Sequence, residues 1–465
     1  MELNEEVVDI IENNNDSFIQ NELIPFLTIP SYTLNRKGID KARDFIISYI
    51  SDFSQNIEEI EGDKNNLIIA KVKGQTKSSL LIYMMYDTQP INNYDDWISP
   101  PFNADINILP SLEKIGKCIV ARGAYNSKTS LLSFLNIVKI LKLKNILPIS
   151  LYLIFDGEEE IGSPTFLKFL KHNINQFKNC IDAYYPSIKQ DIDGVAIVKL
   201  GYKGIISFTL KTNSKNQEVH SSYSNIIPNP SLDLLKIING IYLNNNLQID
   251  TLSKNYILSE QEKLLIDKLC SKEHIEKIGY KAGINQLSFD NIRNLLINYL
   301  FSPTFNISTL KSGYLKKGIK NSVPNSASCN IDIRFAHRLS SEVIFNEIKN
   351  KVYNVTKEIN SKVEIIKNNG YESSRVDIKS ISVKSILKVF KKLGIESEIW
   401  PISAAAAPLS RIQSELGINY ISAGLGIGGN AHCANEFVKL KSIIDTRLSY
   451  YYFLKYYSEF MLGHN

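Results

Sequence analysis

The 465-residue chain has few of the features that mark secreted, membrane-spanning or nucleic-acid-binding proteins. The longest apolar runs are too short to cross a bilayer, and the polar N-terminal segment lacks a secretory leader pattern. Positive and negative side chains are interspersed around a formal net charge of +5, without a basic stripe. The five cysteines form no CxxC pair, which predicts reduced thiols. We therefore expect a cytoplasmic protein that binds neither membranes nor nucleic acids.

What the chain does have is ordinary globular composition and enough length for two or three domains. Hydrophobic residues make up 44% and charged residues 22% of the sequence. Over the first 200 residues, strand and helix patterns alternate. The patterns predict helices at 39–53 and 127–143 and strands at 66–72, 79–86 and 149–155. This alternation favours a mostly parallel sheet whose ligands bind at the carboxyl ends of the strands.

The pattern changes after residue 200 and predicts a smaller α+β domain. The expected order is strand, helix, strand, strand, helix, strand, at 204–212, 229–243, 305–314, 327–335, 340–359 and 362–368. A polar, helix-rich insertion at about 245–303 interrupts it, and alternation resumes through 381–393, 420–424 and 440–462. We predict an α/β domain formed by 1–200 and 370–465, with an α+β domain at 201–369 inserted into it.

Two short segments carry the strongest chemical signals. Glu159 and Glu160 follow a continuous apolar strand and are flanked by glycines. One carboxylate of such a pair can bind a metal while its neighbour acts as a general base. His432, one of only six histidines, lies in a glycine-rich loop near the C-terminus. Taken singly, an acidic run is usually a solvated loop and a lone histidine is usually structural.

Five segments, in order, resemble one family of enzymes. They are YMMYDTQP (83–90), RGAYNSK (122–128), DGEEEIGS (156–163), HSSYSNIIPNP (220–230) and GNAHCANE (429–436). Together they resemble the di-zinc amidohydrolase and metallopeptidase family of carnosinase, dipeptidase V, aminoacylase-1, glutamate carboxypeptidase, acetylornithine deacetylase and succinyl-diaminopimelate desuccinylase. The resemblance implies a zinc-exopeptidase-like α/β domain with a mixed, mostly parallel sheet. It also implies that the inserted domain is a ferredoxin-like βαββαβ lid and dimerisation domain.

The resemblance assigns roles to individual residues. Glu159 falls on the general base, and Glu160 and His432 fall on metal ligands. Asp87 falls on a carboxylate that orients a ligand histidine through a hydrogen bond. His220 falls on a histidine that stabilises the developing oxyanion across a dimer. Arg334 and Asn321 fall on substrate-binding positions, although a strand arginine can also be a plain surface residue.

Three ligand positions of the family are replaced here. Met85 stands for the ligand histidine, Asn126 for the bridging aspartate, and Ser187 for the fifth ligand. Two dications about 3.5 Å apart repel by roughly 19 kcal/mol at an effective dielectric constant near 20, and a neutral amide offsets little of this. A thioether is a poor zinc ligand. The sequence therefore predicts at most one divalent metal (zinc, manganese or cobalt), held by Glu160, His432 and, weakly, Asn126.

Two functions remain open at this point. The first is a homologue that has lost two-metal catalysis and binds a peptide-like or N-acyl amino acid ligand, or modulates a partner. The alternative is an active one-metal amidohydrolase or dipeptidase with Glu159 as its general base. A homodimer is the expected assembly. Because His220 would act across the dimer, a heterodimer with an active paralogue is also consistent with the sequence.

Overall fold

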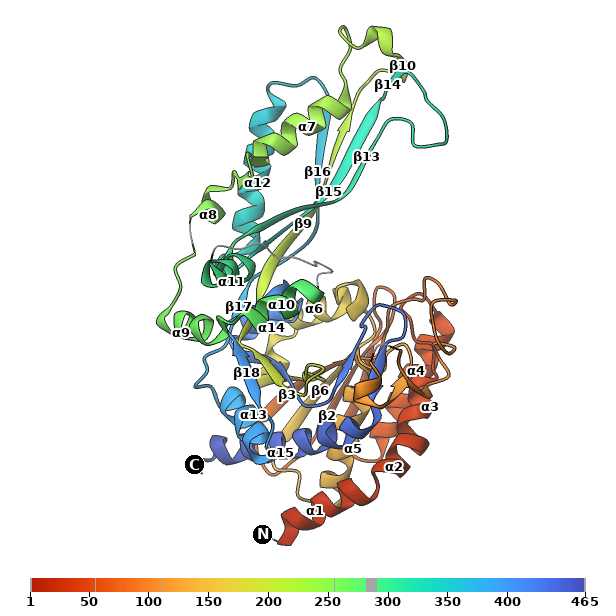
Figure 1. Ribbon diagram of the computed structural model, residues 1–465, viewed down its shortest axis with the longest axis vertical. Coiled ribbons are helices and arrows are strands. Elements are labelled where there is room, and N and C mark those ends of the chain that lie inside the picture. The colour runs from red at the N-terminus through yellow and green to blue at the C-terminus, as the bar shows by residue number, and fades with distance from the viewer. Residues whose placement is uncertain (1, 55, 111, 255, 282–290, 464–465) are drawn as a thin grey trace. The chain divides into compact units, whose positions relative to one another are not determined.

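A computed structural model describes residues 2–54, 56–110, 112–254, 256–281 and 291–463 (Figure 1). The chain forms two compact units. The first comprises Met1–Leu200, Val376–Ile399 and Arg411–Asn465, and the second comprises Gly201–Arg375 and Trp400–Ser410. The five cysteines are free thiols. Within the described ranges, no helix has both the length and the apolar character that a membrane span requires.

The first unit is built on a mixed six-stranded sheet in the order β1-β2-β6-β3-β7-β20. The strands are β1 (Asn56–Ile60), β2 (Leu67–Val72), β6 (Ser150–Asp156), β3 (Ser79–Met85), β7 (Cys180–Pro186) and β20 (Asn419–Ala423). The last four pair in parallel, whereas β1 and β2 run antiparallel. Strands β3 and β6 are buried after their first residue, as their apolar sequences predict for a sheet covered on both faces.

Helices and a small second sheet complete the first unit. The main helices are α1 (Glu2–Asn13), α4 (Arg36–Ser51), α5 (Lys128–Leu143), α6 (Pro164–His172), α13 (Ile381–Lys392) and α15 (Ile443–Met461). Helix α15 packs against both α5 and α13. The second sheet has the order β21-β22-β5-β4, formed by Gly428–Gly429, Phe437–Lys439, Lys117–Val120 and Asp105–Ile108. It lies outside the sequence predictions because such short strands have no clear periodic pattern.

The second unit contains the predicted βαββαβ order. Its antiparallel sheet runs β13-β15-β9-β16, formed by Thr304–Ser312, Ser326–Phe335, Gly201–Asn213 and Lys362–Tyr371. Helices α7 (Pro230–Ile241) and α12 (Ser341–Thr356) pack on the strands and share one apolar core with them (Figure 1). Along β15, and along β9 from Gly204 onward, the burial alternates with each residue, as expected for a half-covered sheet. This is the ferredoxin-like arrangement.

The end of the second unit differs from the predicted boundary. Residues 400–410 cluster with it, although the sequence placed them in the first domain. The cause is strand β19 (Ser403–Ala406), which pairs in parallel with β9. Strand β17 (Ser374–Arg375) also pairs with β9, which carries the unit past residue 369.

The predicted insertion is helical where the structure describes it. It contains α8 (Asp250–Ser253), α9 (Glu260–Leu269), α10 (Lys272–Lys281) and α11 (Ile292–Phe301), and its residues 255 and 282–290 lie outside the described ranges. A buried ion pair fixes α9 to the rest of the second unit. Arg375 Nε lies 3.1 Å from Glu262 Oε1, and the side chains are only 8% and 6% exposed. Arg375 also donates to the Ala336 carbonyl.

We expect Arg375→Met to destabilise the second unit strongly. The substitution leaves Glu262 buried without its partner, which typically costs about 3–5 kcal/mol. For a unit of this size, the loss lowers the midpoint of its thermal unfolding by roughly 6 °C or more. The matched control is Lys263→Met, which breaks the exposed Lys263–Glu260 pair on the same helix and changes stability by less than about 1 kcal/mol. Equal shifts in calorimetry of the two variants would contradict the prediction.

Candidate metal and active site

The predicted site residues of the first unit come from four segments of the chain. Asp87 follows β3, Glu159 and Glu160 follow β6, Asn126 precedes α5, and His432 lies between β21 and β22. Because β3 and β6 are parallel neighbours, their carboxyl ends lie at one edge of the sheet. Residues separated by up to about 350 positions in sequence are thereby available to a common site.

The three successive glutamates have different environments. Glu158 is fully buried, and its carboxylate accepts hydrogen bonds from the backbone N–H groups of Lys64, Asn65 and Thr165. It therefore anchors the loop. Sequence reasoning assigned it no role, because nothing in an acidic triplet distinguishes the residue that turns inward.

Asp87 fixes the backbone of the other two glutamates. Its side chain is buried and accepts hydrogen bonds from Glu159 N (3.2 Å), Glu160 N (3.1 Å) and Thr33 Oγ1 (2.9 Å). Burial raises the pKa of the Asp87 carboxyl well above its usual value, and the charges of Asp156 and both glutamates add to the effect. Asp87 was predicted to orient a ligand histidine. The chain has no histidine to orient at that position, which is occupied by the buried Met85.

Glu160, Asn126 and His432 converge on one another. Asn126 Nδ2 lies 3.1 Å from both Glu160 Oε1 and His432 Nε2, and His432 Nε2 lies 3.3 Å from Glu160 Oε2. The hydrogen bond to Glu160 raises the pKa of His432 above its ordinary value. Gln89, which sequence reasoning missed, donates a 2.7 Å hydrogen bond to Glu160 Oε2. Three of the predicted metal-site residues are therefore brought together.

The donor set fits one divalent cation. A tetrahedral site with bonds of about 2.0–2.1 Å has ligands about 3.3–3.4 Å apart, which matches the 3.3 Å between Glu160 and His432. A half-turn of the Asn126 amide exchanges its nitrogen for its oxygen, since the two are nearly isosteric. One carboxylate, one imidazole and one amide oxygen are then within 3.1–3.3 Å of one another and supply three donors for a cation that takes four ligands.

A second cation does not find ligands. Ser187 Oγ is buried at 2.8 Å from Ser422 Oγ, and Met85 offers only a thioether. Across the part of the chain that the structure describes, no group of three or more His, Cys, Asp or Glu residues could hold a metal ion. The described residues thus fit one cation and not the pair that the resemblance implies.

Glu159 has a raised affinity for a proton. Burial is the main cause that raises the pKa of its carboxyl to about 8, and the charge of Glu160 contributes next. A carboxyl with a pKa near neutrality can both take up and release a proton at working pH. Lys189, which the sequence analysis also missed, interacts electrostatically with Glu159. Burial lowers the pKa of Lys189, and the charge of Glu159 opposes that shift.

A buried ion pair supports the loop that carries Asn126. Glu436 Oε1 accepts from Tyr125 N (3.0 Å) and Asn126 N (2.8 Å), while Arg122 Nη1 donates to Glu436 Oε2 at 2.7 Å. Both side chains are almost fully buried. Glu436 thus acts on the site by positioning Asn126. The motif ending in Glu436 was visible in the sequence, but this function depends on a contact across 310 residues.

The predicted catalytic residue His220 and the predicted substrate-binding residues Asn321 and Arg334 belong to the second unit. His220 lies in β10 (Val219–His220), which pairs with β14 (Ser322–Val323), and its Nδ1 accepts from Ser222 N. The Asn321 carbonyl accepts from Ser221 N, so these two segments adjoin. Arg334 is on β15, with Nε 4.0 Å from Asp332. The catalytic role of His220 and the substrate-binding roles of Asn321 and Arg334 stay predictions.

Comparisons with known proteins find similar sequences over most of the chain. The sequence profile of peptidase family M20/M25/M40 matches residues 81–456. The Cys-Gly metallodipeptidase DUG1 of Saccharomyces cerevisiae is 21% identical over 400 residues, covering 83% of this chain and 80% of that protein. The Beta-Ala-His dipeptidase of Rattus norvegicus is 21% identical over 303 residues, covering 63% and 59%.

Solved structures confirm the predicted fold class. The M20 family metallo-carboxypeptidase Sso-CP2 from Sulfolobus solfataricus has a TM-score of 0.83 and 26% identity, covering 94% of this chain and 98% of its own. The di-peptidase Dug1p from Saccharomyces cerevisiae has a TM-score of 0.79 at 19% identity, covering 97% and 98%. The second similarity carries information on the fold alone.

Proposed function

The chain belongs to peptidase family M20/M25/M40, and on this premise we propose that it hydrolyses the peptide bond of dipeptides with one bound divalent cation. Membership of the family implies the use of a divalent metal. Homologues include proteins named for their action on Cys-Gly and Beta-Ala-His. These relatives favour the active dipeptidase over the loss of catalysis that the replaced ligands suggested.

One observation carries the proposal. Glu160, Asn126 and His432, which are far apart in sequence, present their polar atoms within 3.1–3.3 Å of one another. The adjoining Glu159 has a raised pKa. A carboxylate, an imidazole and an amide beside a second carboxyl form an arrangement that suits metal-dependent hydrolysis of an amide.

Glu160, His432 and the amide oxygen of Asn126 would hold the cation. When bound, a divalent cation polarises the scissile carbonyl and makes a water molecule more acidic. Glu159 takes a proton from the attacking water as the new carbon–oxygen bond forms. The same carboxyl then gives that proton to the leaving nitrogen as the carbon–nitrogen bond breaks.

Asp87 and Lys189 position Glu159 and favour its ionised form. Asp87 accepts hydrogen bonds from the backbone N–H groups of Glu159 and Glu160. These bonds fix the backbone positions from which both carboxylates extend. Lys189 supplies a positive charge that favours the ionised form of Glu159. Together they let one carboxyl alternate between base and acid.

The test is a metal-dependent dipeptidase assay on the full chain. The protein is stripped with a chelator and then supplied separately with zinc, manganese or cobalt. The substrates are Cys-Gly, Beta-Ala-His and an N-acetyl amino acid. We expect hydrolysis of a dipeptide with at least one metal and a loss of about 100-fold or more on chelation, because the cation supplies most of the carbonyl polarisation. No hydrolysis of any substrate with any of these metals would reject the proposal and favour a non-hydrolytic ligand-binding homologue.

A further inference from the structure

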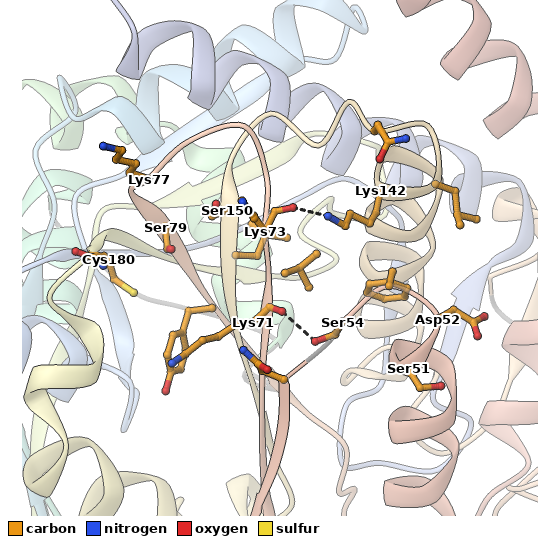
Figure 2. A pocket seen from close by; sticks show the side chains of 18 of the residues that line it. Ser51, Asp52, Ser54, Lys71, Lys73, Lys77, Ser79, Lys142, Ser150 and Cys180 are labelled. Carbon is orange, nitrogen blue, oxygen red and sulfur yellow. Dashed lines mark hydrogen bonds between the residues drawn. The ribbon is translucent and has the colours of Figure 1, made fainter.

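A pocket lies at the amino ends of the parallel strands of the first unit's sheet, at the opposite end from the glutamates. Strands β3, β6 and β7 begin there, with Ser79, Ser150 and Cys180, and their side chains line the pocket (Figure 2). Strand β3 is seven residues long, which separates the two ends by about 20 Å. The pocket has a volume of about 940 Å³. That volume is typical of a site for a small molecule rather than for a single ion.

The charged side chains that line this pocket are mostly positive. Four lysines line it: Lys71, Lys73, Lys77 and Lys142. The acidic residue in its lining is Asp52, which is already paired with Lys139 at 2.7 Å. Among the described residues, none of the ion pairs includes any of the four lysines. Glu58, on the neighbouring strand β1, acts electrostatically on Tyr152 but does not line the pocket.

The lysine ammonium groups retain unused hydrogen-bonding capacity. Lys142 Nζ donates one hydrogen bond, to the Lys73 carbonyl at 2.8 Å, and Lys71 Nζ lies 5.2 Å from the centre of the Tyr152 ring. An ammonium has three N–H donors, so Lys142 keeps two. Lys73 and Lys77 are exposed, and no described side chain accepts from their ammonium groups. Figure 2 shows these four side chains around the pocket.

Gathering like charges around a concave surface creates a positive potential that attracts anions. Lysine ammonium groups bind phosphate oxygens as point charges, and several are needed where more than one phosphate must be neutralised. The side chains of Asn145 and Asn179 also line the pocket and add neutral amide donors. From the volume, the four lysines and the lack of acidic partners, we propose that this pocket binds a small molecule carrying two or more phosphate groups.

The proposal is tested by calorimetric titration of the full chain. The probes are inorganic triphosphate, adenosine triphosphate and, as a matched salt, sodium sulfate at equal ionic strength. We expect triphosphate to bind with a dissociation constant below 1 mM and at least 10-fold more tightly than sulfate. Similar binding of both phosphate probes would identify the phosphate chain as the ligand. At least 10-fold tighter binding of adenosine triphosphate would show that the pocket also accepts the nucleoside.

Paired variants locate the site. Lys73→Ala/Lys77→Ala is expected to weaken triphosphate binding at least 10-fold while leaving the unfolding midpoint unchanged, because both side chains are exposed. The control, Lys37→Ala/Lys384→Ala, removes the same charge from exposed positions of the same unit outside the pocket and should change binding less than 3-fold. Equal losses in the two double variants, or equal binding of triphosphate and sulfate, would overturn the proposal. So would the absence of triphosphate binding to the unaltered chain.

Discussion

Glu159→Gln should reduce dipeptide hydrolysis by about 100- to 10,000-fold, the usual contribution of a general base. Glutamine has nearly the same shape and keeps the backbone contacts that Asp87 makes with residues 159 and 160. It cannot accept the proton of the attacking water. We therefore expect kcat to fall while metal content and the unfolding midpoint stay the same.

The controls for this variant come from the same chain. Glu61→Gln changes an exposed carboxylate of the first unit and should retain full activity. Glu158→Gln alters the side chain that anchors the loop, so it should lower the unfolding midpoint more than it lowers kcat. If Glu159→Gln kept more than a tenth of the activity under saturating metal, the proton acceptor would have to be another residue.

Metal stoichiometry is the second large expected effect. The unaltered chain should bind about one divalent cation, because Glu160, His432 and Asn126 fit one site and the described residues offer no second set. The triple variant Met85→His/Asn126→Asp/Ser187→Asp restores an imidazole, a bridging carboxylate and the fifth ligand. It should bind about two, since the carboxylate offsets much of the repulsion between the cations.

Elemental analysis after dialysis against zinc measures this directly. Asn126→Asp alone is the matched control. It should bind about one cation per chain, because position 85 still lacks an imidazole. His432→Ala should lose the metal. Two cations in the unaltered protein would mean that the ligands have been assigned wrongly.

The sequence was informative where a long pattern or a motif stood out. The apolar run that became β6 and the βαββαβ order of the second unit led to the correct fold class. The motifs led to Glu160, Asn126 and His432, which do converge. The element order follows from local periodicity, whereas the site residues were located by the resemblance of their motifs to those of a known family.

The rest depended on contacts between distant segments. Which glutamate of the triplet turns inward is decided by the backbone amides of Lys64 and Asn65. The position of Lys189 near Glu159 and the support that Glu436 gives to Asn126 likewise arise only after folding. Strand β19 consists mostly of alanine and is a strand because β9 offers it an open edge, a tertiary effect that overrides propensity.

Because β19 belongs to the second unit, that unit is formed by two separate segments of the chain, which limits how it can be exchanged by recombination. The backbone passes from one unit to the other after residues 200, 375, 399 and 410. A gene fragment encoding 201–375 would therefore carry β9 without its parallel partner and leave that edge of the strand unpaired. Recombination that exchanges the second unit alone between relatives must transfer two separate gene segments, encoding 201–375 and 400–410. Loss or replacement of this unit by a single crossover event is consequently disfavoured, even though the unit has a hydrophobic core of its own.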